Sequence, residues 1–337
     1  MFYNQHPSAS IVRLMSSLDD RHVLVTGGAG FLGRRVVALL EATGASVTAP
    51  RSSEFDLTVP GAAEQMLAEY RPTEIIHLAA QVGGIGYNLA QPAPLYLANL
   101  LMGTYIIEAA RHALSVTKTV LVGTVCSYPK ITPVPFAEDQ LWNGYPEESN
   151  APYGIAKKAH LIHAQVNAQQ YGQRLAYLIP TNLYGPGDKF HPSVSHVIPA
   201  LIKKCVEASE SGADHVDVWG TGSASREYLY VDDAAQAIVR AAEADDQPGI
   251  VEPINLGADR EVTIKETVET IAQLVGFTGQ LRWDPSKPDG QPRRGVDGSR
   301  ANRVLGWKPT MDFDEGLRTT IDWYLANRAE AERDPHS

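Results

Sequence analysis

The sequence predicts an α/β fold: a doubly wound parallel sheet of Rossmann type with a smaller C-terminal substrate-binding lobe. Short apolar runs alternate with helical spacings over the first half of the chain, and a glycine-rich turn joins the first run to the first helix. Such alternation predicts parallel strands with helices on both faces of the sheet. After about residue 186 the pattern becomes irregular, with Pro, Gly and Trp between shorter elements. Ligands of this fold bind at the carboxyl ends of the strands.

The expected elements follow one another along the first half of the chain. Apolar runs predict strands at 22–26, 46–49, 75–78, 119–122 and 175–179. Helical spacing of apolar residues predicts helices at 31–43, 60–70, 93–112 and 153–171. Residues 124–152 are rich in Pro, Gly, Ser and Asn and form a long loop. Loops of that length in a compact domain are usually functional.

We divide the chain into three parts. Residues 1–20 are expected to form a mobile N-terminal extension, and 21–185 the Rossmann domain. Residues 226–258 are expected to return to that domain through a helix near 232–243 and a strand near 252–256. The substrate-binding lobe is expected to comprise 186–225 and 259–330.

Composition and charge narrow the class of protein. The chain has 337 residues, 44% of them hydrophobic, and a formal net charge of −10, which suit a globular domain with a full core. Without a basic run we expect no nucleic-acid partner, and no apolar run reaches membrane-spanning length. Cys126 and Cys205 match no metal or disulfide spacing. We therefore expect a cytoplasmic protein without a metal site.

The glycine loop predicts a dinucleotide site. Gly27, Gly30 and Gly33 are spaced GxxGxxG, and Phe31 and Leu32 open the following helix. Small residues let the backbone approach a pyrophosphate, and a helix N-terminus offers free N–H groups to it. The alternative is a glycine-rich turn without a ligand; the position between a strand and a helix favours the cofactor.

The end of the second strand indicates which cofactor binds. An acidic residue there would bind the ribose diol of NAD, but this chain has Arg51 followed by two serines. A guanidinium suits the 2′-phosphate of NADP, so we expect NADP (NADPH). The alternative is that Arg51 is a solvated surface residue. The other expected cofactor contacts are Asp56, Leu57, Leu78, Ala79 and Ala80.

Tyr153 and Lys157 form the expected hydride-transfer pair. They lie four residues apart on one helix, so the phenol and the ammonium share a face. An adjacent ammonium is expected to lower the pKa of the phenol, which can then donate a proton to a carbonyl oxygen as hydride arrives. Thr124, at the end of the fourth strand, has a hydroxyl that can orient the same carbonyl; its other role would be a strand-end hydrogen bond.

Two further residues suggest proton chemistry at carbon. Cys126 follows Thr124 closely, and a thiolate can remove a proton from carbon beside a ketone. The alternative for Cys126 is a small buried filler of the core. His196 is a candidate acid, although a lone histidine is more often structural.

Together these residues resemble the GDP-L-fucose synthase family of extended short-chain dehydrogenase/reductases. The likeness runs from about residue 21 to 328. Besides the glycine loop and the Tyr153–Lys157 pair, it rests on segments 77–85, 126–130, 180–186, 195–201, 218–222 and 226–227.

The resemblance implies an NADPH-dependent enzyme that epimerises C3 and C5 of GDP-4-keto-6-deoxymannose and then reduces C4. It implies base and acid roles for Cys126 and His196, and a reduction triad of Thr124, Tyr153 and Lys157. It implies a homodimer through the helices at 93–112 and 153–171. The implied contacts to the GDP-sugar are Asn182, Val197, Trp219 and Arg226. For Trp219 the alternative is a buried core tryptophan.

At one place the chain differs from the family pattern. The family usually has Ser-Ser-Cys-Ile where this chain has Thr124-Val125-Cys126-Ser127. Alternative functions are therefore a reductase acting on a related GDP-sugar such as a GDP-keto-heptose, and a GDP-sugar epimerase that uses bound nicotinamide without net turnover. A non-catalytic dinucleotide sensor is a third alternative, against which Tyr153 and Lys157 both argue.

Overall fold

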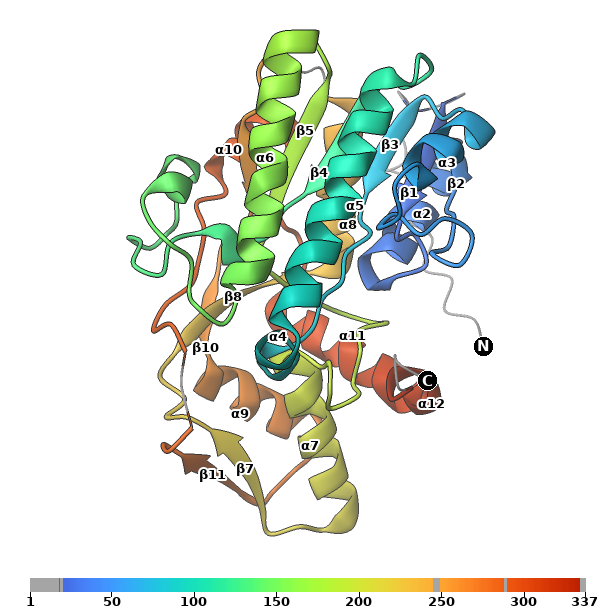
Figure 1. The fold of residues 1–337 in the computed structure, drawn as a ribbon. Coiled ribbons are helices and arrows are strands. Elements are labelled where there is room, and N and C mark those ends of the chain that lie inside the picture. The colour runs from blue at the N-terminus through green and yellow to red at the C-terminus, as the bar shows by residue number, and fades with distance from the viewer. Residues whose placement is uncertain (1–17, 19–20, 245–248, 288–289, 334–337) are drawn as a thin grey trace.

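The computed structural model describes residues 18, 21–244, 249–287 and 290–333. Figure 1 shows two lobes, with a sheet and its covering helices above and a smaller group of helices and short strands below. Of the expected N-terminal extension, residues 1–17 and 19–20 lie outside the described residues. Leu18 is fully buried in the core of the upper lobe.

The upper lobe contains a six-stranded parallel sheet with the order β2-β1-β3-β4-β5-β9. The strands are β1 (His22–Thr26), β2 (Ser46–Thr48), β3 (Glu74–His77), β4 (Lys118–Val122), β5 (Leu175–Pro180) and β9 (Pro253–Leu256). The order reverses between β1 and β3, and ligands of doubly wound sheets bind at such a point. This arrangement confirms the predicted fold class.

Helices cover both faces of this sheet (Figure 1). The helices of the upper lobe are α2 (Phe31–Ala42), α3 (Ala62–Tyr70), α4 (Ile85–Ala90), α5 (Pro92–His112), α6 (Ala151–Tyr171), α8 (Val231–Glu243) and α10 (Ser299–Leu305). The helices α2 and α8 share one core with β1 and β5, while α3, α5 and α6 bury their apolar residues in two cores on the opposite face. A sheet covered on both faces explains why its strands are continuous apolar runs.

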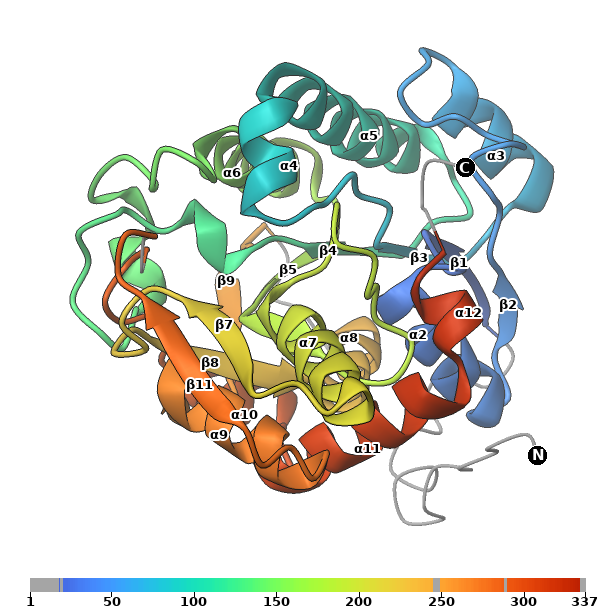
Figure 2. The same ribbon diagram turned by 90° about the horizontal axis from the view of Figure 1, so that it is seen from below.

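The lower lobe has its own aromatic core. Its elements are β6 (Asn182–Tyr184), α7 (Val197–Ser211), β7 (His215–Trp219), β8 (Ser225–Tyr230), β10 (Glu261–Thr263), α9 (Ile264–Leu274), β11 (Gln280–Asp284), α11 (Phe313–Ala326) and α12 (Arg328–Ala331). Phe190 stacks on Tyr324 with ring centroids 4.3 Å apart. Seen from below, α7 and the β7–β11 ribbon lie beneath the carboxyl ends of the sheet (Figure 2).

Three segments lie in a different lobe from the one expected. Strand β6, within 21–185, and strand β8, most of which falls within 226–258, were expected in the Rossmann domain but belong to the lower lobe, where Tyr184, Tyr228 and Tyr230 are buried in its core. The third segment is part of 259–330. Residues 259–330 were assigned to the lower lobe, but Ala301 and Leu305 of α10, with Trp307, are buried in the core shared by α2, α8 and β9. After β11 the chain returns to the upper lobe, and the apolar face of α10 packs there on α8 and β9. An amphipathic helix does not reveal from its own sequence which core it covers.

The long loop at 124–152 is ordered by hydrogen bonds to the last strand of the sheet. It contains the 3₁₀ turns η2 (Val125–Ser127) and η3 (Glu138–Trp142). Asn255 on β9 accepts a 2.8 Å hydrogen bond from the Tyr128 hydroxyl, and its amide donates to the Phe136 carbonyl oxygen at 2.9 Å. The first half of the loop is therefore fixed beside the last strand of the sheet.

Candidate active site

The turn between β1 and α2 has the geometry of a phosphate cradle. Gly27 has φ +71°, a backbone conformation that favours glycine. A Cβ on Gly27 would lie 2.7 Å from the Ala79 backbone nitrogen, and a Cβ on Gly33 would lie 2.1 Å from the Gly27 carbonyl oxygen. The turn therefore requires glycine at both positions, because any side chain there would collide with the backbone.

The N-terminus of α2 offers donors to an anion. Gly30 is its N-cap and provides no side-chain hydrogen bond, and no acidic residue lies in the first turn. The first N–H groups of a helix have no partner within the helix, and the helix dipole makes this end positive. Phe31 and Leu32 open this turn, as the sequence predicted.

The end of β2 exposes a cation at the same edge of the sheet. Arg51 and the serines that follow it are exposed. Asp56 accepts hydrogen bonds from the Thr58 hydroxyl at 2.7 Å and the Thr58 N–H at 2.9 Å, which lower the pKa of its carboxyl group. Leu57 is buried in the core with α3. The guanidinium is thus accessible to a ligand, whereas the Asp56 carboxylate already serves the Thr58 turn.

The chain after β3 is tied to the glycine turn. The Thr26 hydroxyl lies 2.7 Å from Nδ1 of His77 and accepts a 3.2 Å hydrogen bond from the Ala79 N–H. Burial, followed by the charge of Lys157, holds the pKa of His77 well below its usual value. A neutral His77 therefore helps to hold Leu78, Ala79 and Ala80 against Gly27.

Cys126 is fixed against α6 by tight packing. The hydroxyl of Ser127 donates to the Gly154 carbonyl oxygen at 2.9 Å, and a Cβ on Gly154 would lie 2.3 Å from the Cys126 carbonyl oxygen. Thr124 is the N-cap of η2, and its Oγ1 accepts a 3.2 Å hydrogen bond from the Cys126 N–H. Because that bond uses an oxygen lone pair, the Thr124 hydroxyl proton is left to donate to another group.

Burial controls the charge state of the tyrosine–lysine pair. Burial, with the neighbouring Cys126 as a smaller cause, raises the pKa of Tyr153. Lys157 is 3% exposed, and burial lowers its pKa to about 8. The expectation that Lys157 lowers the pKa of Tyr153 is therefore wrong for this structure, because burial raises the pKa of the phenol. The phenol keeps its proton, which is the form that a proton donor requires.

His196 lies in the lower lobe, at the N-cap of α7, whereas Cys126 and Tyr153 lie in the upper lobe. Its side chain and that of Val197 are exposed, yet protein surrounds the imidazole closely enough that burial, together with Lys189, lowers its pKa. This part of the lower lobe touches the upper lobe, because a Cβ on Gly84 would lie 2.8 Å from the Ser195 carbonyl oxygen. Among the described residues no hydrogen bond joins His196 to Cys126, so a substrate placed between them would have to connect them.

Asn182 and Arg226 lie where β6 and β8 pair. The Asn182 side-chain amide donates to the Glu227 carbonyl oxygen at 3.1 Å, and Nη1 of Arg226 donates to the carbonyl oxygens of Ser225 and Gln291 at 2.7 Å each. Both side chains are half-buried. Their positions bring an amide and a guanidinium to the side of the lower lobe that faces the sheet.

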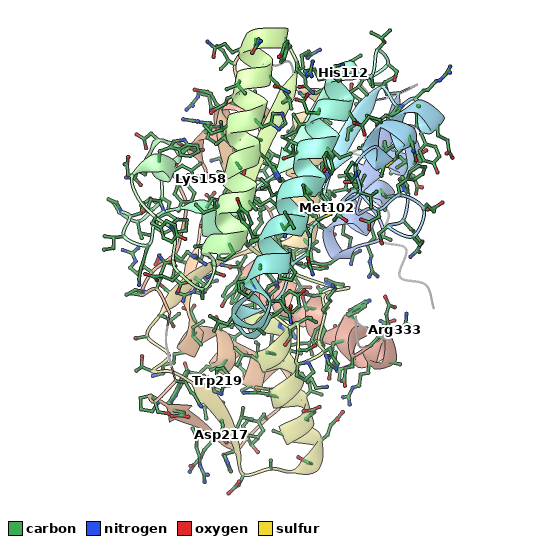
Figure 3. The ribbon with its side chains drawn as sticks, viewed as in Figure 1. Met102, His112, Lys158, Asp217, Trp219 and Arg333 are labelled. Carbon is green, nitrogen blue, oxygen red and sulfur yellow. The ribbon has the colours of Figure 1, made fainter. Side chains whose placement is uncertain are left out.

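Trp219 is a surface platform rather than a core residue. It is 64% exposed at the end of β7, and Figure 3 shows it in the lower lobe near Asp217. The Nζ atoms of Lys204 and Lys287 lie 5.8 Å and 5.6 Å from its ring centroid. The alternative of a buried core tryptophan is therefore wrong. The two lysines, which were not anticipated, bring positive charge to the face of this ring although the chain is acidic.

This chain is similar to known proteins in both sequence and structure. The NAD dependent epimerase/dehydratase family model matches residues 23–257. A probable GDP-L-fucose synthase 1 of Oryza sativa subsp. japonica is 41% identical over 312 residues, covering 92% of this chain and 94% of the relative.

This chain belongs to the NAD-dependent epimerase/dehydratase family, among the GDP-L-fucose synthases.

Solved structures of similar proteins agree with that family. A crystal structure of a GDP-L-fucose synthetase from Naegleria fowleri bound to NADP has a TM-score of 0.82 and 29% identity, covering 94% of this chain and 97% of that one. A GDP-6-OMe-4-keto-L-xylo-heptose reductase from C. jejuni has a TM-score of 0.83 and 25% identity, covering 91% and 98%. The upper and lower lobes are thus both present in these enzymes.

The departures from the fucose synthase pattern point mostly into the core. Val125 is buried in the core of α6 and β5. Ser127 is also buried, and its hydroxyl donates to the Gly154 carbonyl oxygen. Neither side chain is exposed to a ligand. Only the methyl group of Thr124 distinguishes this site from one with serine at that position.

The structure also brings to the site a residue that the sequence analysis missed. Nη1 of Arg294 lies 3.9 Å from Sγ of Cys126, although the two residues are 168 positions apart. Arg294 follows Arg293 in a segment rich in Gly and Pro, so no periodicity distinguished it from a surface arginine. Among the described residues we find no group of three or more His, Cys, Asp or Glu that could hold a metal ion.

Proposed function

We propose that this protein is an NADPH-dependent epimerase–reductase that converts GDP-4-keto-6-deoxy-D-mannose to GDP-L-fucose. The proposed reaction is epimerisation at C3 and C5 followed by reduction at C4. The observation that carries the proposal is the junction of η2 and α6, where Thr124, Cys126 and Tyr153 are fixed together at the carboxyl edge of the sheet. The 41% identity to a probable fucose synthase supports the same substrate.

The residues at the carboxyl edge fit NADPH. A Cβ would fill the cradle at Gly27 and Gly33, and the uncapped start of α2 suits a pyrophosphate. Arg51 would hold the 2′-phosphate. Lys157 would hold the nicotinamide ribose from the floor of the site. When bound, NADPH supplies the hydride that reduces the C4 carbonyl.

For epimerisation, the chain provides a base and an acid on opposite walls. The Cys126 thiolate removes the proton from the carbon beside the ketone: the C–H bond breaks, an S–H bond forms and the electron pair moves onto the C4 oxygen. His196 returns a proton to the other face of that carbon. Its lowered pKa makes the protonated ring a stronger donor.

For reduction, the chain holds the C4 oxygen and supplies its proton. The Thr124 hydroxyl proton, which the Cys126 N–H leaves free, donates to that oxygen. Tyr153 transfers its phenolic proton to the same oxygen, because its raised pKa keeps the phenol protonated until charge develops there. Negative charge develops on the C4 oxygen in both half-reactions, and these two donors stabilise it there.

The nucleotide end of the substrate is proposed to lie on the lower lobe. Trp219 offers an exposed ring for a nucleobase, flanked by Lys204 and Lys287. Arg226 and Asn182 lie between this corner and η2, where a diphosphate would be, and Val197 would contact the sugar. These cations give the local attraction that a chain of net charge −10 needs for an anionic substrate.

The test is to incubate the protein with GDP-4-keto-6-deoxy-D-mannose and NADPH. We expect one NADPH oxidised for each sugar consumed and GDP-L-fucose identified by NMR. Tyr153→Phe is the matched control, since it removes only the hydroxyl group and should abolish the reduction. No cofactor oxidation by the folded protein, or activity unchanged in Tyr153→Phe, would contradict the proposal.

A reductase acting on a related GDP-keto-heptose is the second candidate, because a heptose reductase of C. jejuni shares the whole fold. The two candidates differ in whether the sugar exchanges protons. Incubation in D₂O should place deuterium at C3 and C5 of the product. A reduced sugar that lacks deuterium at both positions would favour the second candidate.

We further propose a cytoplasmic homodimer. Among the described residues, α6 exposes Ile162 and Val166 one turn apart, and α5 exposes Leu97; these apolar side chains could contact a second copy. Cys126 and Cys205 are both free thiols, which supports a reducing compartment. No helix among the described residues is long and apolar enough to cross a membrane.

A further inference from the structure

We propose that Arg294 is a catalytic residue of the epimerisation half-reaction, where its guanidinium stabilises the Cys126 thiolate that removes the proton from the sugar. This inference rests on the proposed function and extends it to a residue that stands outside the Tyr153–Lys157 and Cys126–His196 pairs. Four observations support it: the contact with sulfur, the lack of a neutralising carboxylate, the way the backbone fixes Arg294, and the contrast with Arg293.

The contact with sulfur comes first. Nη1 of Arg294 donates to Sγ of Cys126 at 3.9 Å. A thiolate accepts such a bond more strongly than a thiol does, because one partner is then a full anion. Cysteine nucleophiles and bases are found beside cations for this reason. The contact therefore favours the form of Cys126 that can act as a base.

The charge of the Arg294 guanidinium is also not neutralised by an ion pair among the described residues. Among the described residues no carboxylate lies within ion-pair distance of Arg294, and its Nε is buried without a hydrogen-bond partner. An arginine with a carboxylate partner would have most of its field cancelled locally. Arg294 instead has its Nη1 donor beside the reacting sulfur and an unused Nε proton.

A buried glutamate fixes the backbone on which Arg294 lies. The Glu227 N–H donates to the Arg294 carbonyl oxygen at 3.1 Å, and the Glu227 carboxylate accepts from the Val296 N–H at 2.8 Å. The same carboxylate accepts from the Asp259 N–H at 2.9 Å. Glu227 is 3% exposed, so this cluster is shielded from water. It holds the segment at 294–296 against the loop of Cys126.

Among the described residues, Tyr153 from α6 and Arg294 from the C-terminal segment both face Cys126. Tyr153 is protonated and neutral, so Arg294 is the charged group of the two. Its neighbour Arg293 points elsewhere: Nε of Arg293 lies 2.8 Å from Oε1 of Glu261 in an exposed ion pair. The two adjacent arginines carry the same charge but touch different groups, which makes Arg293 a natural control for the contact with Cys126.

The test measures Cys126 alkylation by iodoacetamide in Arg294→Met, Arg294→Lys and Arg293→Met, followed by peptide mass spectrometry. Cys205 is fully buried and burial raises its pKa to about 11, so Cys126 is the thiol that reacts. At pH 7 we expect Arg294→Met to react about tenfold more slowly than the unmodified chain. The pH profile should move to higher pH, Arg294→Lys should recover most of the rate, and Arg293→Met should not change it.

The assay needs no substrate, so it separates this inference from the proposed function. An unchanged alkylation profile in a folded Arg294→Met protein would overturn the role of Arg294, even if the enzyme makes GDP-L-fucose. A shifted profile in an enzyme that is inactive on GDP-4-keto-6-deoxymannose would keep the role and refute the substrate. With an active enzyme, Arg294→Met should lose deuterium incorporation at C3 and C5 more strongly than reduction at C4.

Discussion

At the scale of single residues, the site holds groups whose charges are costly to bury. Lys157 is 3% exposed and its pKa falls to about 8, because burial disfavours the ammonium. Its unfolded value is near 10.5. Below pH 8 both states bind the proton, and the folded protein carries the full penalty. Between pH 8 and 10.5 the unfolded state binds more protons, so stability rises with pH.

We therefore predict that Lys157→Met stabilises the protein at pH 7 while abolishing reduction. The gain in unfolding free energy should be at most about 3 kcal/mol, since each pKa unit is worth about 1.4 kcal/mol. It should shrink as pH rises from 8 to 10.5. Urea titrations at several pH values measure it.

Lys158→Met is the matched control for this prediction. Lys158 is also buried, but its Nζ donates to the Leu141 carbonyl oxygen and lies 4.4 Å from the Trp142 ring centroid. Figure 3 shows Lys158 on the side of α6 that faces the long loop. Its removal leaves a carbonyl oxygen without its donor and should destabilise the fold. Equal destabilisation by both variants would show that Lys157 is held by contacts of similar value.

The sequence could predict residues whose partners lie nearby along the chain. Tyr153 and Lys157 share one helix, and the glycines share one turn, so spacing alone brings them together. Arg294 could not be found, because its partner is 168 positions away and only the fold joins them. The pKa direction of Tyr153 was also out of reach, since it depends on burial rather than on the neighbouring ammonium.

At the scale of elements, helix and strand bounds agree with the sequence pattern to within about two residues. Helix α6 begins at Ala151 instead of 153, because Pro152 is well tolerated in a first turn, where its missing N–H has no partner to lose. Strand β3 begins at Glu74, a polar residue that is buried on an ion pair with Arg21. Local pattern cannot reveal such a pair between distant residues.

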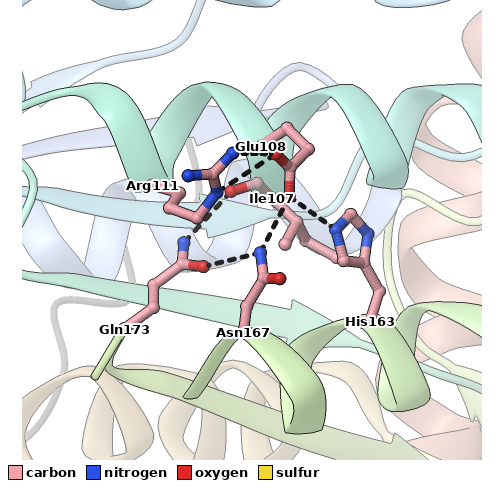
Figure 4. A network of polar contacts seen from close by, with 6 residues as sticks. All are labelled: Ile107, Glu108, Arg111, His163, Asn167 and Gln173. Atoms are coloured by element: carbon pink, nitrogen blue, oxygen red, sulfur yellow. Dashed lines mark hydrogen bonds and ion pairs between the residues drawn. The ribbon is translucent and has the colours of Figure 1, made fainter. Parts of the chain in front are cut away.

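The α5–α6 pair is joined by a polar network around Glu108 (Figure 4). The Glu108 carboxylate accepts hydrogen bonds from Nη2 of Arg111 at 2.6 Å, Nε2 of His163 at 2.8 Å and Nδ2 of Asn167 at 2.9 Å. The Arg111 hydrogen bond, ahead of the others, lowers the pKa of Glu108 to about 2. The stabilisation is present above pH 4.5 and is lost as pH falls towards 2.

We predict that Glu108→Gln lowers the unfolding free energy at pH 7 by about 1 kcal/mol, a value reduced by the partial exposure of the carboxylate. The difference from the unmodified chain should narrow as pH falls below 4.5. Thermal unfolding at pH 7 and pH 4 compares the two. Glu41→Gln, an exposed glutamate on α2 outside this network, should have no effect at either pH. A pH-independent difference for Glu108→Gln would mean that the charge of Glu108 is not what joins the helices.

At the scale of the whole molecule, the residues of the candidate site are distributed over two lobes. The upper lobe carries the glycine turn and the proposed base and proton donor, Cys126 and Tyr153, while the lower lobe carries His196 and Trp219 with its two lysines. The two lobes meet where a Cβ on Gly84 would lie 2.8 Å from the Ser195 carbonyl oxygen. Helix α6, which carries Tyr153 and Lys157, also exposes Ile162 and Val166.

The proposed dimer therefore predicts a link between assembly and α6. Ile162 and Val166 are 45% and 47% exposed and lie one helical turn apart on α6. Burying a charge among apolar groups is costly, so Ile162→Glu should convert the dimer to a monomer in light scattering. Leu114→Glu is the matched control: Leu114 is fully exposed beyond the end of α5 and should leave the dimer intact. A dimer that survives Ile162→Glu and Val166→Glu together would place the interface elsewhere, and a chain that is monomeric without any substitution would refute the dimer itself.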